Sequence, residues 1–196
     1  MIAPLASNIS WERMVDAVQK VEDRLLRSTA ALDAAKIPYA VIGGTAIAAW
    51  VSSVDPGAVR NTKDVDLLVR RADLPAVVKA MESVGFCYAK TFGVDAFVDG
   101  PTGRPSEGVH LLFEGEKVKE SDQVATPALS ESLRAPRFQV ISLEAIVRMK
   151  LTSFRVKDQT HLVDLMQLGL IDRSWLAKVP PELAPRLQGL LDNPNP

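Results

Sequence analysis

The sequence is poor in cysteine and histidine and has no long apolar segment, and each scarcity excludes a class of protein. Its single cysteine, Cys87, excludes an internal disulfide framework and a cysteine-rich zinc site. No apolar run is long enough to span a membrane, and the first ten residues lack the basic and apolar regions of a secretion signal. We therefore expect no membrane span and a cytoplasmic location.

Strong charge of either sign is also lacking. The formal net charge is −1 at pH 7, so no global basic field attracts nucleic acid or an anionic membrane, although a local patch remains compatible with this value. With 196 residues, of which 47% are apolar, the chain has a globular composition and is long enough to bury a core.

Periodicity and turn residues predict an α+β protein. A first helix, capped by Ser10, should bury one apolar face, formed by Met14, Val18, Val21, Leu25 and Leu32. Trp11 lies on the same helix, where core packing is the favoured use and a dimer or partner groove the alternative. Further helices are expected at 45–50, from Asp73 to Gly85, from Ser142, from Asp158 to Gly169, and at 173–179 and 181–191. Strands are expected at 39–42, 64–69, 86–90, 94–98, 109–113 and 138–141. The order of these elements predicts a mixed sheet flanked by helices over residues 1–141, and a C-terminal helical segment, 142–196, packed on it as one compact unit.

Two aspartates alternate with apolar residues in the run "DVDLLV". Because successive strand residues face opposite sides, Asp64 and Asp66 should share one face while Val65, Leu67 and Val69 enter the core. Two carboxylates about 6–7 Å apart can share divalent cations, and their hard oxygen atoms suit Mg²⁺ or Mn²⁺. A half-exposed strand with acidic solvent-facing residues is the alternative interpretation.

A pair of glycines interrupts the apolar stretch "VIGGTAIAAW". Gly43-Gly44 either forms a simple strand-to-helix turn with a positive φ angle, or allows the backbone to approach a phosphate at the start of the next helix. In the second case Thr45 offers both a helix cap and a hydroxyl group to the phosphate oxygens.

Together, "GGTA" and "RNTKDVDLLV" resemble the nucleotidyltransferase fold of the DNA polymerase β superfamily. Within it the chain is most similar to a minimal bacterial branch that includes AbiEii-type toxin nucleotidyltransferases, whose R-x-T-x-D-h-D pattern matches Arg60 to Asp66. The later "RVKDQTHLVDL" is similar to a helical segment of those proteins.

The resemblance implies a nucleotide site and a metal site. Gly43, Gly44 and Thr45 would hold the phosphates of an NTP, and Asp64 and Asp66 would bind Mg²⁺ or Mn²⁺. Further nucleotide contacts are implied for Arg60, Thr62, Lys63 and Lys157. Asp158, beside Lys157, is expected to cap its helix.

One expected residue is missing from the pattern. The family carries a third carboxylate on a neighbouring strand, but the corresponding run, "VHLLF", has His110 there. If Val109, Leu111 and Phe113 face the core, His110 faces the other side, as a catalytic residue or as a structural hydrogen-bonding residue. Imidazole binds Mg²⁺ poorly and favours Mn²⁺ or Zn²⁺. Glu114 shares the parity of His110 and is an alternative third acid.

The sequence thus leaves three functions open. The first is an active nucleotidyltransferase that moves a nucleoside monophosphate from an NTP to a hydroxyl group of a tRNA, a protein or a small molecule such as an aminoglycoside. The second is a nucleotide-binding or regulatory module without turnover, or a module that interacts with an antitoxin. The third is an unrelated α+β domain. The near-zero net charge disfavours a large RNA acceptor.

Overall fold

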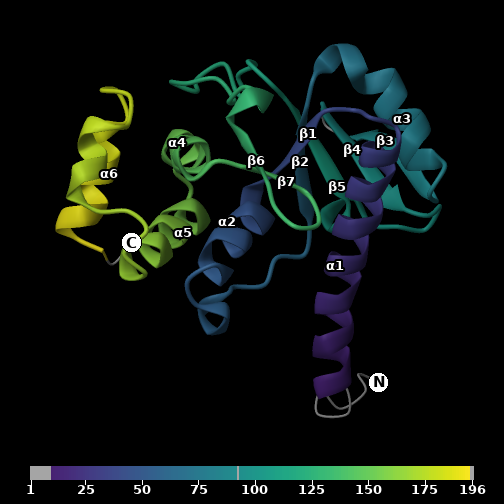
Figure 1. The fold of residues 1–196 in the computed structure, drawn as a ribbon, viewed down its shortest axis with the longest axis horizontal. Coiled ribbons are helices and arrows are strands. Elements are labelled where there is room, and N and C mark those ends of the chain that lie inside the picture. Colours follow the sequence, from purple (N-terminus) through teal and green to yellow (C-terminus); the bar gives the residue numbers. More distant parts are fainter. Residues whose placement is uncertain (1–9, 92, 195–196) are drawn as a thin grey trace, which may run out of the picture.

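A computed structural model describes residues 10–91 and 93–194. In this part of the chain a seven-stranded mixed sheet lies between two groups of helices (Figure 1). The strand order is β3-β4-β5-β2-β1-β7-β6, with β1 (Tyr39–Ile42), β2 (Val65–Val69), β3 (Phe86–Thr91), β4 (Val94–Asp99), β5 (Val109–Phe113), β6 (Ser132–Arg134) and β7 (Gln139–Ile141). The α-helices of the described residues are α1 (Trp11–Ala34), α2 (Gly43–Ser52), α3 (Leu74–Glu82), α4 (Leu143–Ser153), α5 (Val156–Gln167) and α6 (Ala184–Asp192). The predicted α+β class is confirmed.

Helices α1 and α3 cover one face of the sheet (Figure 1). Their apolar residues form one core cluster with the inward residues of the central strands. These strand residues are Val65, Leu67, Val69, Val109, Leu111 and Phe113. The predicted alternation is therefore confirmed, and the residues between them face the other side of the sheet.

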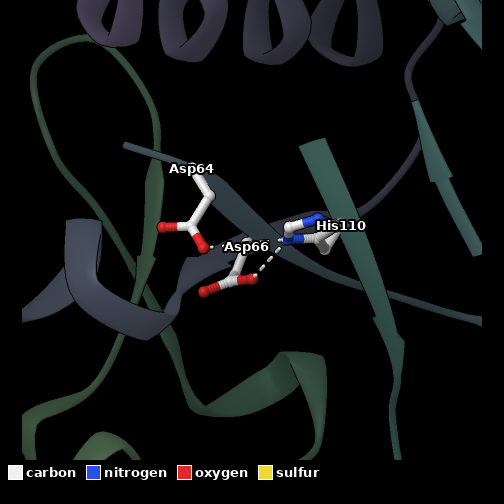
Figure 2. A group of neighbouring side chains, drawn as sticks. All are labelled: Asp64, Asp66 and His110. Carbon is white, nitrogen blue, oxygen red and sulfur yellow. Dashed lines mark ion pairs between the residues drawn. The ribbon is translucent and has the colours of Figure 1, made fainter. Parts of the chain in front are cut away.

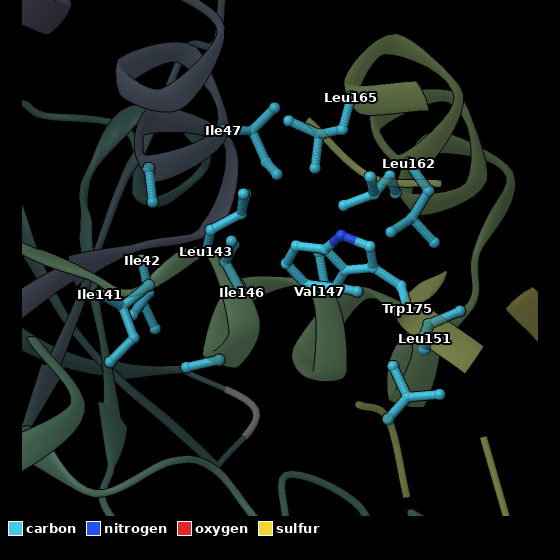
Figure 3. Close-up of a cluster of buried hydrophobic side chains, with 14 of the residues drawn as sticks. Ile42, Ile47, Ile141, Leu143, Ile146, Val147, Leu151, Leu162, Leu165 and Trp175 are labelled. Carbon is cyan, nitrogen blue, oxygen red and sulfur yellow. The ribbon is translucent and has the colours of Figure 1, made fainter. Parts of the chain in front are cut away.

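The second face is covered by α2, α4 and α5, with α6 outside them (Figure 1). Figure 3 shows the core of this layer, in which Trp175 packs among the aliphatic side chains of α4 and α5. Ser142 caps α4 by accepting a hydrogen bond from the amide of Ala145 at 3.2 Å, as the sequence predicts. Phe154, with a φ of 44°, reverses the chain between α4 and α5 in the left-handed conformation.

The first half of α1 differs from the prediction. Ser10 caps the helix as expected, and Val21, Leu25 and Leu32 are buried. The side chains of Trp11, Met14 and Val18, however, are 72%, 60% and 44% exposed. The helix extends past the sheet, so its first turns have no strand to cover (Figure 1). The expectation that Met14 and Val18 pack in the core, with Trp11 beside them, is wrong.

Two shorter predictions also need correction. The polar segment 114–135 is predicted from its sequence to be a loop with a short helix near 127–133. A short helix is present at Leu129–Glu131, but Ser132–Arg134 form an edge strand, β6. Helix α2 begins at Gly43, two residues before Thr45, so Thr45 is an internal residue of the helix and not its cap.

Within residues 10–91 and 93–194, none of the helices combines the length and apolar character needed to cross a membrane.

The turn from β1 into α2 has room only for glycine. Gly43 has a φ of +68°, as the sequence predicts for this turn. A Cβ atom on Gly43 would lie 1.9 Å from Oδ2 and 2.9 Å from Cβ of Asp66 on the neighbouring strand. Both the backbone angle and the close approach to Asp66 therefore exclude a side chain here.

We expect Gly43→Ala to destabilise the protein more than Gly169→Ala. Gly169 has nearly the same φ, +69°, but nothing lies within 4 Å of an added Cβ atom. In both variants the alanine must adopt a left-handed backbone conformation, which costs about 1–2 kcal/mol. Only Gly43→Ala must in addition displace Asp66. Urea denaturation measures both free energies of unfolding. Equal losses in the two variants would contradict the tight contact with Asp66.

A second prediction concerns His161 of α5, which is 6% exposed and whose Nδ1 has no hydrogen-bond partner among the described residues. Burial, together with the nearby charges of Lys150 and Lys157, lowers the pKa of His161 to about 4, whereas Asp158 and Asp164 oppose this shift. In the unfolded chain the pKa of histidine is about 6.5, so between these values the unfolded state binds more protons. The free energy of unfolding should therefore fall as the pH falls through this window.

The decrease attributable to His161 is on the order of 3 kcal/mol over the whole window. The variant His161→Gln has no titrating group at this position. Its free energy of unfolding, measured by urea denaturation at a series of pH values, should depend less steeply on pH between about 6.5 and 4 than that of the unmodified protein. Parallel curves for the two proteins would show that His161 does not titrate differently on folding.

Candidate active site

Asp66 and His110 lie side by side because β2 and β5 pair in parallel with these two residues in register. On the other side of β2, Ile42 at the end of β1 pairs with Asp66, so the chain turns at Gly43 beside the same carboxylate. Asp64 directly precedes β2, and its side chain extends toward the other two (Figure 2). One possible ligand atom from each of Asp64, Asp66 and His110 lies within 4.8 Å of the others.

The two ring nitrogens of His110 have different neighbours. Nε2 lies 2.8 Å from the carbonyl oxygen of Pro105, to which it donates, because a carbonyl group can only accept. Nδ1 lies 3.4 Å from Asp66 Oδ1 and 3.9 Å from Asp64 Oδ2. The hydrogen bond with Asp66 raises the pKa of His110, with further support from Pro105 and Asp64 against the opposing effect of burial. When neutral, the ring therefore directs an unprotonated nitrogen at the two carboxylates.

Hydroxyl groups on both sides hold Asp64. Thr62 donates to Asp64 Oδ1 at 2.6 Å, and Thr45 donates to the carbonyl oxygen of Asp64 at 3.4 Å. Burial raises the pKa of Asp64, but the bond from Thr62 and the charges of Lys157 and His110 together hold it below its ordinary value. Asp64 is therefore ionised at neutral pH and ready to bind a cation.

The loop before β2 is tied to the C-terminal helices. The guanidinium group of Arg60 binds both carboxylate oxygens of Asp164 on α5, at 2.6 and 3.0 Å. The side chain of Lys63 is exposed, and its carbonyl oxygen accepts from Arg24 at 2.8 Å. Arg60 therefore fixes the segment that carries Thr62 and Asp64.

A buried carboxylate organises the junction of α4 and α5. Asp158 is 0% exposed and accepts from Lys150 Nζ at 2.8 Å, Ser153 Oγ at 2.8 Å and Arg155 Nε at 2.7 Å. Burial alone would raise the pKa of Asp158, but Arg155, Lys150 and Ser153 hold it far below its usual range. Its Oδ2 also accepts from the amide of Arg155 at 3.2 Å, so Asp158 caps the helix as predicted, but from within its first turn, because α5 begins at Val156 and not at Asp158.

A cavity of about 530 Å³ separates this junction from the acidic cluster. Six of the residues predicted from the sequence line it, namely Gly43, Gly44, Asp64, Asp66, His110 and Lys157. Four others do not, namely Thr45, Arg60, Thr62 and Lys63. The threonines contact Asp64, and Arg60 contacts Asp164, so these three lie around the site without facing the cavity.

Several lining residues were not assigned to the nucleotide site from the sequence, among them three that bind Asp158. Lys150, Ser153 and Arg155 face the cavity from α4 and the turn after it. The sequence places Lys150 and Arg155 in a group of cations with Arg148 and Lys157, for which a solvated helix face is the favoured interpretation. Asp158, which follows Lys150 by only eight residues, brings them together because the chain reverses sharply at Phe154.

The alternative third acid does not belong to the cluster. The carboxylate of Glu114 accepts a hydrogen bond from the amide of Leu129 at 2.8 Å and takes no part in the Asp64, Asp66 and His110 group. The third position is therefore held by His110. Two carboxylates and an imidazole fit a divalent cation, and the imidazole favours Mn²⁺ over Mg²⁺.

No protein-family model and no curated protein matches this sequence. Several solved structures, however, are similar to this chain. The antibiotic-resistance factor ANT(2'')-Ia is 16% identical, with a TM-score of 0.51 and coverage of 92% of each chain. JHP933 from Helicobacter pylori is 16% identical, with a TM-score of 0.52, and the match covers 96% of this chain and 78% of that one. A candidate nucleotidyltransferase from H. pylori is 17% identical, with a TM-score of 0.52, over 95% of this chain and 80% of that one. The chain therefore has a nucleotidyltransferase-like α+β fold, as the sequence motifs predict.

Proposed function

We propose that this protein is a metal-dependent nucleotidyltransferase that moves a nucleoside monophosphate from an NTP to a hydroxyl group of an acceptor. One observation carries the proposal. On a nucleotidyltransferase-like fold, Asp64, Asp66 and His110 converge beside the Gly43-Gly44 turn. The close approach of that turn to Asp66 would place a phosphate bound at the turn next to a cation bound by the carboxylates.

The cavity walls suit a triphosphate. Gly43 and Gly44 form the first turn of α2, where free amide groups and the helix dipole favour an anion. Lys150, Arg155 and Lys157 line the same cavity from α4 and α5 and would bind the phosphate oxygens. Phosphate binding by Lys157 agrees with the sequence motif, and Lys150 and Arg155 are added to it here.

Residues beside the cavity would act indirectly. Thr45 and Thr62 hold Asp64, and Arg60 anchors the loop through Asp164. We therefore assign these three to positioning. Lys63 is exposed and outside the cavity, and it would meet only a nucleotide that extends into solvent.

The proposed reaction joins the acceptor oxygen to the α-phosphorus of the NTP. The bond from that phosphorus to the β-phosphate oxygen breaks, pyrophosphate leaves, and the proton of the hydroxyl group is released to water. A divalent cation held by Asp64, Asp66 and His110 supplies positive charge at the α-phosphate when it is bound. The hydrogen bonds from Thr62 to Asp64 and from His110 to Pro105 hold the ligand atoms in place before binding.

The imidazole at the third position supports a second candidate function. If His110 stays protonated, it pairs with the two carboxylates and competes with the cation. The protein would then be a nucleotide-binding or regulatory module, or an antitoxin-interacting member of an AbiEii-type branch, without turnover. Transfer of label from [α-³²P]ATP to any acceptor separates the enzyme from such a module.

The first test removes the charges of the acid pair. We expect Asp64→Asn/Asp66→Asn to weaken Mn²⁺-dependent ATP binding by on the order of 100-fold, because both carboxylates are proposed ligands. Isothermal titration with each NTP, in Mn²⁺ and separately in Mg²⁺, measures the effect. The matched control, Asp16→Asn/Asp23→Asn, removes two exposed charges from α1 and should bind as the unmodified protein does. Unchanged binding in the first double variant would refute the proposed site.

The second test concerns the third ligand. The unmodified protein should bind ATP more tightly with Mn²⁺ than with Mg²⁺, because imidazole is a poor Mg²⁺ ligand. His110→Asp supplies a third carboxylate at the position in register with Asp66, so we expect the Mn²⁺ preference to fall by about tenfold. Titrations with the two metals give the ratio of affinities. An identical ratio in the variant and the unmodified protein would mean that His110 does not bind the cation.

A further inference from the structure

The cavity has two chemically different ends. Its charged end carries the acid pair, His110 and the cations of α4 and α5. Its apolar end is formed by Val94, Ala96, Leu112, Val118 and Val124 of β4, β5 and the segment 116–126, a segment that also contributes the charged residues Lys119 and Asp122 to the lining. The function proposed above uses only the charged end, so the apolar end needs an occupant of its own.

Strand register places the apolar end directly beyond His110. Ala96 of β4 pairs with His110 of β5, on the side away from Asp66. Leu112 follows His110 by two residues and Val94 precedes Ala96 by two, so both project from the same face of the sheet, roughly 7 Å farther along. The Gly43-Gly44 turn lies on the opposite side of Asp66, across β2. A phosphate chain at that turn and a molecule at the apolar end would therefore approach the acid pair from opposite sides, as an in-line displacement requires.

The charges of the cavity disfavour a polycationic acceptor. Among the described residues that line it, Asp122 is the one carboxylate besides Asp64 and Asp66, and its Oδ2 already accepts from the amide of Lys119 at 2.9 Å. Four cations line the same cavity, namely Lys119, Lys150, Arg155 and Lys157. A ligand with several ammonium groups would meet these four cations with Asp122 as the one carboxylate, among the described residues of the lining, beyond the acid pair.

Carboxylates near the apolar end are occupied elsewhere. Asp95 alternates with Val94 and Ala96 on β4 and so faces the other side of the sheet, where Tyr88 and Lys90 contact it. Glu116, at the start of the segment that carries Val118, binds Arg71 through both carboxylate oxygens at 2.5 Å. Neither side chain lines the cavity, so neither adds negative charge to its apolar end.

We infer that the apolar end is the acceptor site and that it takes an uncharged hydroxyl compound with an apolar or aromatic part. The inference rests on the proposed nucleotidyltransferase function. The apolar part packs on Leu112, Val94 and Val118, and the hydroxyl group points toward His110 and the acid pair. A polycationic aminoglycoside and an RNA are both disfavoured as acceptors, since in the described part of the lining Asp122 is the one carboxylate beyond the acid pair for the first, and Lys119 is the one cation of the segment 116–126 for the second.

The test follows the methyl signals of the full chain by ¹H–¹³C NMR. The probes are 4-nitrophenyl β-D-glucopyranoside, which is neutral and aromatic, kanamycin, which is polycationic, and a single-stranded RNA oligonucleotide. Each is added after the site is saturated with adenosine 5′-(α,β-methylene)triphosphate and Mg²⁺. We expect the glucoside to shift the methyl signals of Val94, Leu112, Val118 and Val124, with no shift of Val77 in the opposite core. Kanamycin and RNA should leave these four signals unchanged.

A blocking variant and a matched control complete the experiment. Val94 is 46% exposed, so Val94→Trp should fold and fill the apolar end, whereas Val54→Trp changes a 52% exposed valine that does not line the cavity. We expect Val94→Trp to weaken glucoside binding at least about tenfold and Val54→Trp to leave it unchanged. ATP binding, measured separately by isothermal titration, should be the same in both variants.

Four results would overturn the inference. The first is a shift of the four methyl signals by kanamycin or RNA. The second is a shift of these signals by the ATP analogue alone, which would mean that the base fills the apolar end. The third is no binding of the glucoside at 10 mM, and the fourth is equal glucoside affinity in the two tryptophan variants. A loss of ATP binding in Asp64→Asn/Asp66→Asn tests the proposed function independently. Failure of the proposed function is therefore distinguishable from failure of the inferred acceptor site.

Discussion

The close packing of two carboxylates against a backbone turn is the constraint on which the site depends. Asp64 and Asp66 repel each other, and Asp66 also leaves no space for a side chain on Gly43. The surroundings offset the repulsion with Thr62 on one carboxylate and His110 between the two. Such an arrangement lowers the cost of holding both charges only in part, and a cation bound between the carboxylates would offset the remaining repulsion.

The opposite wall depends on a single buried charge. Asp158 has no exposure to solvent and is stable there only because Lys150, Ser153 and Arg155 bind it. The same bonds hold Lys150, itself 5% exposed, at the surface of the cavity. The junction of α4 and α5 therefore holds the ammonium group of Lys150 in a fixed position at the cavity. A phosphate group could bind this ammonium group at little further entropic cost.

The sequence predicted the parts of this site that follow from local geometry. Strand alternation placed Asp66 and His110 on one face, and the need for a positive φ identified Gly43. It did not separate the predicted residues that line the cavity from those that lie around it. The partners of Thr62 and Arg60 are identified only by the folded structure. Thr62 binds Asp64 next to the turn, and Arg60 binds Asp164 on α5, more than a hundred residues away along the chain.

Periodicity failed in the same way at α1. Met14 and Val18 share the helical face of Val21 and Leu25, but a sequence pattern does not state where the sheet beneath the helix ends. Equally, the short strand β6 has three residues with little apolar character, and only its pairing with β7 defines it. Local patterns therefore predicted which face of each helix or strand is apolar. How far along each element that face is buried depends on the packed structure.

The charge distribution explains how a nearly neutral chain can hold a triphosphate. The net charge is −1, yet four cations line one cavity, and the acids outside it are largely bound to other arginines, such as Glu116 to Arg71. Electrostatic attraction is thus concentrated where a nucleotide would bind and is weak over the remaining surface. A large polyanionic acceptor needs an extended basic surface as well as a pocket, because each neutralised phosphate requires its own cation. A pocket lined by four cations is suited to a small anion inside it and to an acceptor that gains its affinity from apolar contact.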